Sequence, residues 1–484
     1  MIRTVVLVST ENFVWHSMQE IIPSLEQHWL QSQQDQLHDV KSVNIDQLSI
    51  KDYLPLLFAA DNIVITCFTF KMAQLTKFFR DELRLKARYI VHLHNQSTIA
   101  CWPFHKFSLG GQLHEDDIFI SSCSRDQKTF LLGFEKARVE CVPFTFSKGM
   151  APDMMTVVKK TTDKNFVFIG RLSVQKNLHT LLWAFAIFMQ RNPGYKGQLI
   201  FVGGEDDLGS PNMDMKSPGY QEYLQSLVQL LSLQQKVVFK GHMQREELYR
   251  ELDSQDYVFV TPSLHSDENF GMAVFRALVE GRNAVLTDWG GHTDYVDYFK
   301  DQVHLIPVYG ESMGPWISPY QLAECLEEVI CKDHHGYHLP AYYQSQGISK
   351  KYQEIALTRE SSMSPLKRSI LADSVLQARE QYSSESATKI FRSYDDPNVQ
   401  PFFKGYGMGA FEESKTQKRL FAVPWLKADV GMCSVQDIHR GSFQFESLLS
   451  EDSVEVQFID GSHRKIALSV LSILQANGWI VTQL

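Results

Sequence analysis

Short apolar runs of strand length alternate with helix-length segments over the first 300 residues, and this alternation restricts the possible folds more than any other feature of the chain. Strand–helix–strand units of this kind form right-handed crossovers and parallel sheets. The sequence therefore predicts two doubly wound α/β domains that bind ligands in a cleft at the carboxyl ends of their strands. The expected strands are Val5–Val8, Asn62–Thr66, Tyr89–Leu93, Ile118–Ser121 and Val139–Val142, then Asn165–Ile169, Gln198–Val202, Val237–Phe239, Tyr257–Val260 and Ala284–Thr287.

Three domains follow from this organisation. Residues 1–150 form a first Rossmann-like domain, and the polar stretch at its end, 151–164, has the character of a linker. Residues 151–396 form a second Rossmann-like domain, whose last helix, at about 373–394, is a candidate to pack back on the first. Residues 397–484 are expected to be a small α+β module, winged-helix-like in shape, with Ser462 as the N-cap of an apolar helix that ends at Gly478. The expected helices are Phe70–Leu85, Asn177–Arg191, Gly219–Ser232, Gln244–Leu252 and one after Gly271.

The composition fits such a protein and argues against several other classes. The 484 residues are 44% hydrophobic and 21% charged, close to the averages of globular proteins. The net charge of -9 argues against a nucleic-acid binder, which needs a basic surface. The seven scattered cysteines include no C-x-x-C pair and indicate reduced thiols in a cytosol. The run after Arg3 predicts a first strand rather than a signal peptide, and no stretch has the length of a membrane-spanning helix.

Two cations, Arg171 and Lys176, stand between a buried strand and the helix that follows it. A helix N-terminus attracts anions through its free N–H groups and its dipole, and two neighbouring cations strengthen that attraction. The loop therefore suits a diphosphate, whose charge the cations can neutralise when it leaves. The alternative is a pair of solvated loop charges. Gly203 and Gly204, at another strand end, allow a ligand to approach the backbone, although an ordinary glycine turn explains them equally well.

A third loop contains Glu268, followed by Asn269, Phe270 and Gly271, with a helix expected from Met272. The amides of residues 270–272 are then expected to point into the cleft, because the first N–H groups of a helix have no partner inside it. The carboxylate can accept hydrogen bonds from two hydroxyl groups, which is how proteins commonly hold a sugar ring. The alternative is an acidic residue that only complements the helix dipole.

In their order along the chain, the segments GRL…QKN, FVGG, VVFKGHM, ENFG and VEGRNAVLTDWGGHTDYV resemble the donor-binding domain of glycosyltransferase family 4, over residues 166–296. The resemblance implies the GT-B fold, in which two Rossmann-like domains face each other across a cleft. It implies a retaining glycosyltransferase that moves a sugar from a nucleotide-sugar, a UDP- or GDP-sugar in the first instance, to an acceptor hydroxyl. It also implies that no metal or other cofactor takes part, and no D-x-D triplet occurs in the chain.

The same resemblance implies a role in the synthesis of cell-surface polysaccharide or glycoconjugate, with a carbohydrate or lipid-linked acceptor held by the first domain. Catalytic roles fall to Glu268, Lys176, Arg171 and His94, the last of which resembles a family histidine near the transferred sugar. The donor site implied by the resemblance comprises Arg171, Lys176, Gly203, Gly204, Glu268, Asn269, Phe270, Gly271, Met272 and Arg276.

The sequence departs from the family pattern at three places. STENFVWHS, in which Trp15 and His16 are candidates to contact the acceptor, replaces a Gly-Gly loop, and VPFTFS replaces a Pro-Asn-Gly turn. Arg276 stands where the family has a second glutamate that accepts ribose hydroxyls, and an arginine can only donate. Glu280 lies about 6 Å further along the helix axis, which makes it a poor replacement. A non-catalytic GT-B protein that binds a nucleotide-sugar or a partner is therefore the second candidate.

Two further segments suggest partners. LTKFFRDELRLKARY has five basic residues, and four of them, interspersed with apolar residues, suit either a peripheral contact with the inner face of a membrane or, the favoured alternative, a helix packed on its own sheet. The region 397–484 is a candidate module for docking to a partner in polysaccharide assembly. The four basic residues are Lys77, Arg80, Arg84 and Arg88.

Overall fold

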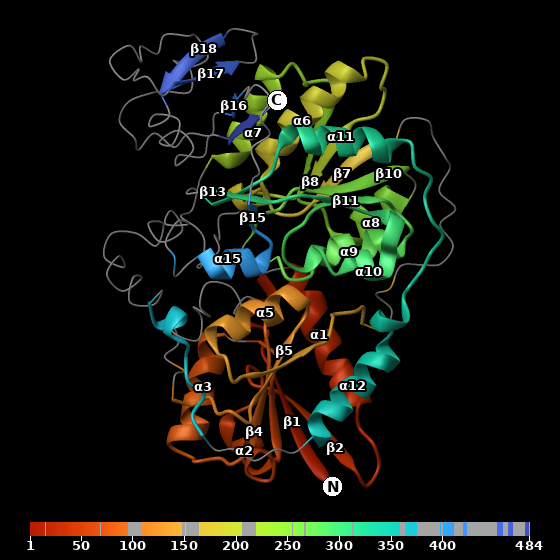
Figure 1. Ribbon diagram of the computed structural model, residues 1–484. Coiled ribbons are helices and arrows are strands. Elements are labelled where there is room, and N and C mark those ends of the chain that lie inside the picture. The colour runs from red at the N-terminus through yellow and green to blue at the C-terminus, as the bar shows by residue number, and fades with distance from the viewer. Residues whose placement is uncertain are drawn as a thin grey trace.

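The chain folds into two six-stranded parallel sheets that lie at opposite ends of its main body, in the computed structural model shown in Figure 1. Helices cover both sheets, and the last part of the chain adds a small four-stranded sheet beside the second domain. The residues that the structure describes are 1–14, 16–67, 69–94, 109, 111–147, 151, 164–205, 219–253, 255–265, 268–311, 314–358, 364–374, 397, 400–410, 420–423, 453–457, 463–467 and 480–483.

The first sheet has the strand order β2-β1-β3-β4-β5-β6, and every neighbouring pair is parallel. Alternate residues of β1 enter two different clusters of buried side chains, so both faces of the sheet are covered. The strands are β1 (Ile2–Val8), β2 (His38–Asn44), β3 (Asn62–Ile65), β4 (Arg88–His92), β5 (Ile118–Ser121) and β6 (Arg138–Cys141). The helices are η1 (Glu11–Val14), α1 (His16–Gln31), α2 (Ile50–Phe58), α3 (Phe70–Asp81) and α5 (Ser124–Gly133).

The second sheet has the order β12-β11-β10-β7-β8-β9, again all parallel. The direction of winding reverses between β7 and β10, which is where doubly wound sheets bind their ligands. The strands are β7 (Asn165–Ile169), β8 (Leu199–Val202), β9 (Val237–Gly241), β10 (Tyr257–Thr261), β11 (Ala284–Thr287) and β12 (Val303–Ile306). The helices are η2 (Val174–Lys176), α6 (Leu178–Arg191), α7 (Tyr220–Leu230), α8 (Arg245–Asp253), α9 (Met272–Val279), η3 (Gly290–His292), α10 (Tyr295–Phe299), η4 (Lys300–Gln302) and α11 (Pro319–Ile330).

After the second domain the chain returns to the first. Following η5 (Ala341–Tyr343), helix α12 (Ser345–Leu357) lies along α1 (Figure 1), where Tyr352 stacks on Trp29 with 4.6 Å between ring centroids. Arg88 donates from Nη1 to the carbonyl of Thr358 at 2.5 Å and from Nη2 to that of Ile355 at 3.1 Å. These bonds satisfy carbonyls that a helix leaves unpaired at its C-terminus, so a first-domain arginine fixes this helix.

The chain then passes between the domains once more. The amide of Ser369 donates to the carbonyl of Gly133 in α5, and α15 (Gln400–Tyr406) packs on the same helix. The next strand, β15 (Gly409–Ala410), pairs with β13 (Tyr309–Glu311), itself paired with β14 (Gly314–Trp316), so the chain ends this passage on the second domain. The helix expected at about 373–394 lies almost wholly outside the described residues.

In the last region the described residues form a four-stranded sheet of order β18-β17-β16-β19. The prediction of a helix beginning at Ser462 is wrong, because residues 463–467 form β18, antiparallel to β17. The pairing of these residues with β17 outweighs their local sequence pattern. The other residues of the predicted helix lie outside the described part. The strands are β16 (Leu420–Val423), β17 (Ser453–Gln457), β18 (His463–Ala467) and β19 (Ile480–Gln483).

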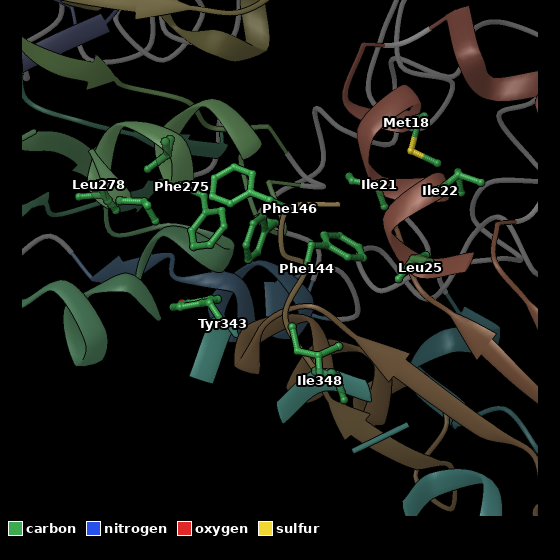
Figure 2. Close-up of a cluster of buried hydrophobic side chains, with 14 of the residues drawn as sticks. Met18, Ile21, Ile22, Leu25, Phe144, Phe146, Phe275, Leu278, Tyr343 and Ile348 are labelled. Carbon is green, nitrogen blue, oxygen red and sulfur yellow. The ribbon is translucent and has the colours of Figure 1, made fainter. Parts of the chain in front are cut away.

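One cluster of buried side chains joins the two domains (Figure 2). Phe146, from the segment after β6, stacks on Phe275 of α9 with 4.7 Å between ring centroids, and Phe144 meets Phe270 edge-on at 5.4 Å. The segment VPFTFS thus inserts two aromatic rings where the family pattern has a turn. The predicted fold class, two Rossmann-like domains in the GT-B arrangement, is confirmed.

The basic segment does not form one basic helix face. Arg80 is buried in an ion pair with Asp117, with Nη2 2.6 Å from Oδ1, and Arg88 is a buried residue of β4. Two of the four cations therefore stabilise the first domain, which removes the basis for a membrane-binding stripe of four. In the described part of the chain, no helix combines the length and apolarity needed to cross a membrane.

Candidate functional site

The switch point of the second sheet brings together two loops that are far apart in sequence. The loop after β7 carries Arg171 and Lys176, and the loop after β10 carries Glu268. Because β7 and β10 are parallel neighbours, their carboxyl ends meet at one edge of the sheet. Lys176 Nζ lies 2.5 Å from Glu268 Oε2, so the two strongest candidates from the sequence are in direct contact.

The carboxylate of Glu268 is held by a set of short contacts. Ser263 Oγ donates to Oε2 at 2.5 Å, on the same oxygen that Lys176 contacts. The second oxygen, Oε1, faces His292 Nε2 at 3.8 Å. The carboxylate therefore presents Oε1 to a ligand while Oε2 keeps the side chain in place.

Charge around Glu268 keeps it ionised. Burial alone disfavours the carboxylate, but the neighbouring Lys176 ammonium holds its pKa well below the usual range. Burial lowers the pKa of the His265 imidazole, and the nearby Lys176 and Arg171 lower it further. The electrostatic influence of Arg171 on His265 indicates that both predicted cations act at this end of the sheet.

Special backbone conformations shape the two loops. Asn177, between η2 and α6, has φ of 56°, and Gly271, before α9, has φ of 76°. A Cβ at Gly271 would lie 3.5 Å from Glu268 Oε1, so α9 begins directly beside the free carboxylate oxygen. The orphan amides expected at residues 270–272 therefore lie close to Glu268.

Gly203 and Gly204, after β8, contact the backbone of the neighbouring loop that carries Arg171. A Cβ at Gly203 would stand 1.9 Å from the carbonyl oxygen of Gly170, and φ of Gly203 is 145°. The carbonyl of Gly204 accepts a hydrogen bond from the amide of Leu172 at 2.8 Å. Gly203 is thus required by its contact with the loop that carries Arg171, whereas the backbone bond of Gly204 does not depend on its being a glycine.

The residues after Glu268 have different surroundings. Asn269 donates from Nδ2 to the carbonyl of His94, which links the second domain to the first. Phe270 is buried in the aromatic cluster, and its carbonyl accepts from Tyr295 Oη at 2.6 Å. Met272 packs on the same cluster. The side chains of Phe270 and Met272 thus pack on the aromatic cluster, whereas those of Glu268 and Asn269 make polar contacts.

His94 lies at the carboxyl edge of the first sheet. Its Nε2 lies 2.5 Å from the carbonyl oxygen of Thr66, and its ring stacks on Phe144 at 5.4 Å. Burial lowers the pKa of the imidazole to about 4, so the ring is neutral at pH 7. The neighbouring His92 is buried and accepts from Trp29 Nε1 at 2.9 Å, which gives it a structural role. Trp15 lies outside the described residues.

Arg276 turns toward the opposite end of α9. Its Nε lies 2.9 Å from Glu280 Oε1, one helical turn further on. Glu280 also accepts from Tyr257 Oη at 3.4 Å, and Tyr257 is the first residue of β10, whereas Glu268 follows that strand's last residue. The structure therefore directs Arg276 away from Glu268.

Contacts across the domain boundary were not predicted from the sequence. Ser124, at the start of α5, donates from its amide at 2.7 Å and from Oγ at 2.6 Å to Asp294. Arg125 donates to the carbonyl of Asp288 at 2.6 Å and to its Oδ1 at 2.7 Å. These bonds hold the first domain against the loop that carries His292. Asp288, His292 and Asp294 all belong to the DWGGHTD stretch, but the sequence of that stretch does not reveal their partners.

No group of three or more histidine, cysteine or acidic side chains in the described part of the chain has the geometry of a metal site. The cluster at Glu268 instead combines one carboxylate with cations and helix N-termini. Such a set suits an anionic ligand that also carries hydroxyl groups.

The comparisons with known proteins concern mainly this second domain. Residues 153–311 match the family model of the glycosyl transferases group 1. Mannosylfructose-phosphate synthase of Agrobacterium fabrum is 31% identical over 149 residues, which is 30% of each chain. An uncharacterised glycosyltransferase of Methanocaldococcus jannaschii is 29% identical over 147 residues, 30% of this chain and 32% of the other. The match thus spans less than a third of the length of these relatives, and it supports the class predicted from the sequence, a GT-B glycosyltransferase.

Solved structures are similar at lower identity. The crystal structure of Anabaena HepE with UDP and glucose is 14% identical, covers 80% of this chain and 100% of that one, and gives a TM-score of 0.43. The OtsA apo structure is 12% identical, covers 82% and 99%, and gives 0.46. Scores at this level support no inference about the ligands of this chain.

Proposed function

We propose that this protein is a retaining glycosyltransferase of the family 4 type, which transfers a sugar from a UDP- or GDP-sugar to an acceptor hydroxyl. The observation that carries the proposal is the contact of Lys176 with Glu268 at the switch point of the second sheet. A cation for phosphate and a carboxylate for sugar hydroxyls are the two groups that a nucleotide-sugar site needs. The group 1 match over the same segment supports it.

The cations Lys176 and Arg171 would bind the diphosphate, and the carboxylate of Glu268 would bind the sugar. Lys176 has three N–H donors, of which Glu268 takes one, so donors remain for a diphosphate beside the N-terminus of α6. Arg171 adds a second positive charge, and together they stabilise the charge that develops on the leaving diphosphate without a metal ion. Glu268 Oε1 accepts hydrogen bonds from hydroxyl groups of the sugar. In a retaining transfer the leaving phosphate takes the proton of the acceptor hydroxyl as the new glycosidic bond forms.

The first domain would supply the acceptor side. The backbone carbonyl of His94 accepts from Asn269 across the boundary, so His94, whose ring is neutral, is positioned next to the loop of Glu268. Transfer to a carbohydrate or lipid-linked acceptor in polysaccharide or glycoconjugate synthesis is the setting that we propose, in the cytoplasm. Closure over the donor would exclude water and limit hydrolysis.

The experiment is a nucleotide-sugar screen followed by Lys176→Ala. We expect wild-type protein to hydrolyse or transfer one of UDP-glucose, GDP-mannose or ADP-glucose, and the variant to be about 10²- to 10³-fold slower, as when one charge-stabilising donor is lost. Lys240→Ala is the matched control, because Lys240 forms an exposed ion pair with Glu251 at 2.8 Å. Turnover by Lys176→Ala at the wild-type rate would falsify the proposal.

A second candidate is a non-catalytic GT-B protein that binds a nucleotide-sugar without turnover. Arg276 favours it, since its ion pair with Glu280 leaves no acceptor for ribose hydroxyls at this position. The same screen separates the two candidates. A nucleotide-sugar that raises the melting temperature but is neither hydrolysed nor transferred supports the second one.

A further inference from the structure

His292 lies beside Glu268 and takes no part in the function proposed above. It belongs to the turn η3 after β11, and its side chain is 0% exposed. Its Nε2 faces Glu268 Oε1 at 3.8 Å and has no hydrogen-bond partner among the described residues. A buried polar atom without a partner costs free energy, so its position next to the sugar-binding oxygen requires an explanation.

The glycines before His292 fix its position. A Cβ at Gly290 would stand 2.2 Å from the carbonyl oxygen of Glu268, and one at Gly291 would stand 2.0 Å from that of Asn269. The amide of Gly291 donates to the carbonyl of Glu268 at 2.7 Å. The turn that carries His292 is therefore built against the backbone of the Glu268 loop, and the two side chains keep a fixed relation.

The hydrogen bonds of Thr287 define the tautomer of the ring. Thr287 Oγ1 donates its only hydrogen to the carbonyl of Ser263 at 2.6 Å. The contact of 3.2 Å between Oγ1 and His292 Nδ1 therefore needs the hydrogen to come from Nδ1. In a neutral ring with hydrogen on Nδ1, Nε2 carries a lone pair and accepts.

The ring is neutral at pH 7. Burial lowers the pKa of His292 to about 4; Glu268 raises it, while Lys176 and Arg125 lower it. Nε2 and Oε1 are thus two acceptors that face each other with no donor between them. They repel weakly when the site holds no ligand, and each can take one hydrogen from a ligand that presents two donors side by side.

We propose that His292 Nε2 and Glu268 Oε1 form a paired acceptor that recognises two adjacent hydroxyl groups of the donor sugar. The inference rests on the proposed function, because it assigns a selectivity role at the same donor site. A vicinal diol supplies one hydrogen to each acceptor, whereas a sugar with one of these hydroxyls missing leaves a buried acceptor unsatisfied. His292 then acts as a specificity residue that selects the sugar and leaves the diphosphate to Lys176 and Arg171.

Two variants of His292 separate this role from a structural one. His292→Asn keeps an amide at the Nδ1 position, where it can still bond Thr287, but has no atom at the position of Nε2. His292→Gln reaches that position with its amide oxygen and so keeps an acceptor. Affinities are measured by calorimetry for UDP, GDP and ADP, and for UDP-glucose, GDP-mannose and ADP-glucose, with wild-type protein and both variants.

We expect all three proteins to bind the nucleoside diphosphate within about twofold of each other, which also reports that the variants fold. His292→Asn should weaken binding of the nucleotide-sugar about tenfold, the equivalent of one hydrogen bond, and His292→Gln should restore most of that affinity. Equal effects of Asn on nucleotide and nucleotide-sugar, or no effect on either, would overturn the inference and leave the proposed function intact.

Monodeoxy analogues of the donor give an independent measurement on the wild-type protein. We expect two of the analogues to bind about tenfold more weakly than the parent donor, and the hydroxyls that these two lack to be neighbours on the sugar ring. If the loss of either of two adjacent hydroxyls never lowers the affinity, the inference is overturned, and this result does not depend on whether the variants fold. If wild-type protein binds none of the nucleotides or nucleotide-sugars, the proposed function fails and the inference with it.

Discussion

At the scale of single residues, Arg276 departs from the family pattern, and its side chain forms an ion pair within its own helix. The guanidinium pairs with Glu280 within its own helix, and both side chains are nearly buried, at 12% and 8% exposure. The pair therefore contributes more than an exposed i,i+4 pair would, because little solvent screens it. The arginine and Glu280 form one unit, and neither is available as the family's second glutamate.

Arg276→Glu tests whether the family pattern can simply be restored. The variant would place two carboxylates one turn apart in a nearly buried position, and we expect the free energy of unfolding to fall by about 1–3 kcal/mol. Urea unfolding measures this, with Arg276→Gln as the uncharged comparison. A variant as stable as wild type would mean that the ion pair contributes nothing.

The sequence could indicate Arg171, Lys176 and Glu268, because each follows a strand end where the polypeptide has a recognisable local pattern. His292 could not be found in this way. It lies 24 residues after Glu268 in sequence, and the contact depends on glycines that pack backbone on backbone, which no local pattern reveals. The direction of the Arg276 side chain likewise depends on Glu280 and Tyr257 rather than on its own position in the motif.

At the scale of elements, α9 is the part on which the site depends. It begins beside Glu268 and is held from the first domain by Phe146, whose ring stacks on Phe275 (Figure 2). Phe146 is 5% exposed and belongs to the segment that departs from the family pattern. Phe146 thus connects the position of the Glu268 loop to the first domain.

Phe146→Ala should cost about 3–5 kcal/mol of stability by cavity formation and should also weaken donor binding, since α9 loses its support. Phe119→Ala is the matched control, because Phe119 is buried in the separate core of the first domain. It should lose similar stability without a change in donor affinity. Calorimetry with the donor identified in the screen distinguishes the two, and equal losses of affinity in both variants would contradict the idea.

The central strands of both sheets were predictable because they are continuous apolar runs buried on both faces. The outer strands β2 and β12 were not predicted. β2 reads HDVKSVN, in which only Val40 and Val43 are apolar, and its pairing with β1 over seven residues makes it a strand. The β18 strand was predicted as helix for a similar reason, since its pairing with β17 outweighs local propensity.

At the scale of the whole molecule, buried histidines make stability depend on pH. Burial lowers the pKa of His179 to about 3 and that of His292 to about 4, against an ordinary value of 6.5. The unfolded chain takes up these protons first, so the stability they contribute is present above pH 6.5 and is lost as pH falls toward 4. Burial raises the pKa of Asp117 to about 6, which offsets part of this loss.

We therefore expect the free energy of unfolding to be lower at pH 5 than at pH 7, by about 2 kcal/mol for each of the two histidines before the offset. Urea unfolding at the two pH values measures the difference. His179→Phe should lose less stability over the same interval than wild type. Equal stability at both pH values would show that these rings are not neutral in the folded protein.

Truncation separates the roles of the two parts of the last region. Ending the chain after Ala410 keeps α15 and β15, and we expect donor affinity to stay within about twofold of the full chain, since no described donor-site residue is removed. Ending it after Asp396 also removes Tyr406, whose carbonyl accepts from Arg125 at 3.2 Å, and should lower the melting temperature. Loss of donor affinity on the shorter deletion, after Ala410, would assign residues 411–484 a part in the site.

The chain passes between the two domains three times: after β6, before α12, and from the segment around Ser369 to β15 (Figure 1). Two bodies joined by one flexible link can both bend and twist about that link. Three separate links suppress the twist and leave bending as the main remaining freedom. We therefore expect any relative movement of the two domains to be mainly a bend, with His94 held near the loop of Glu268.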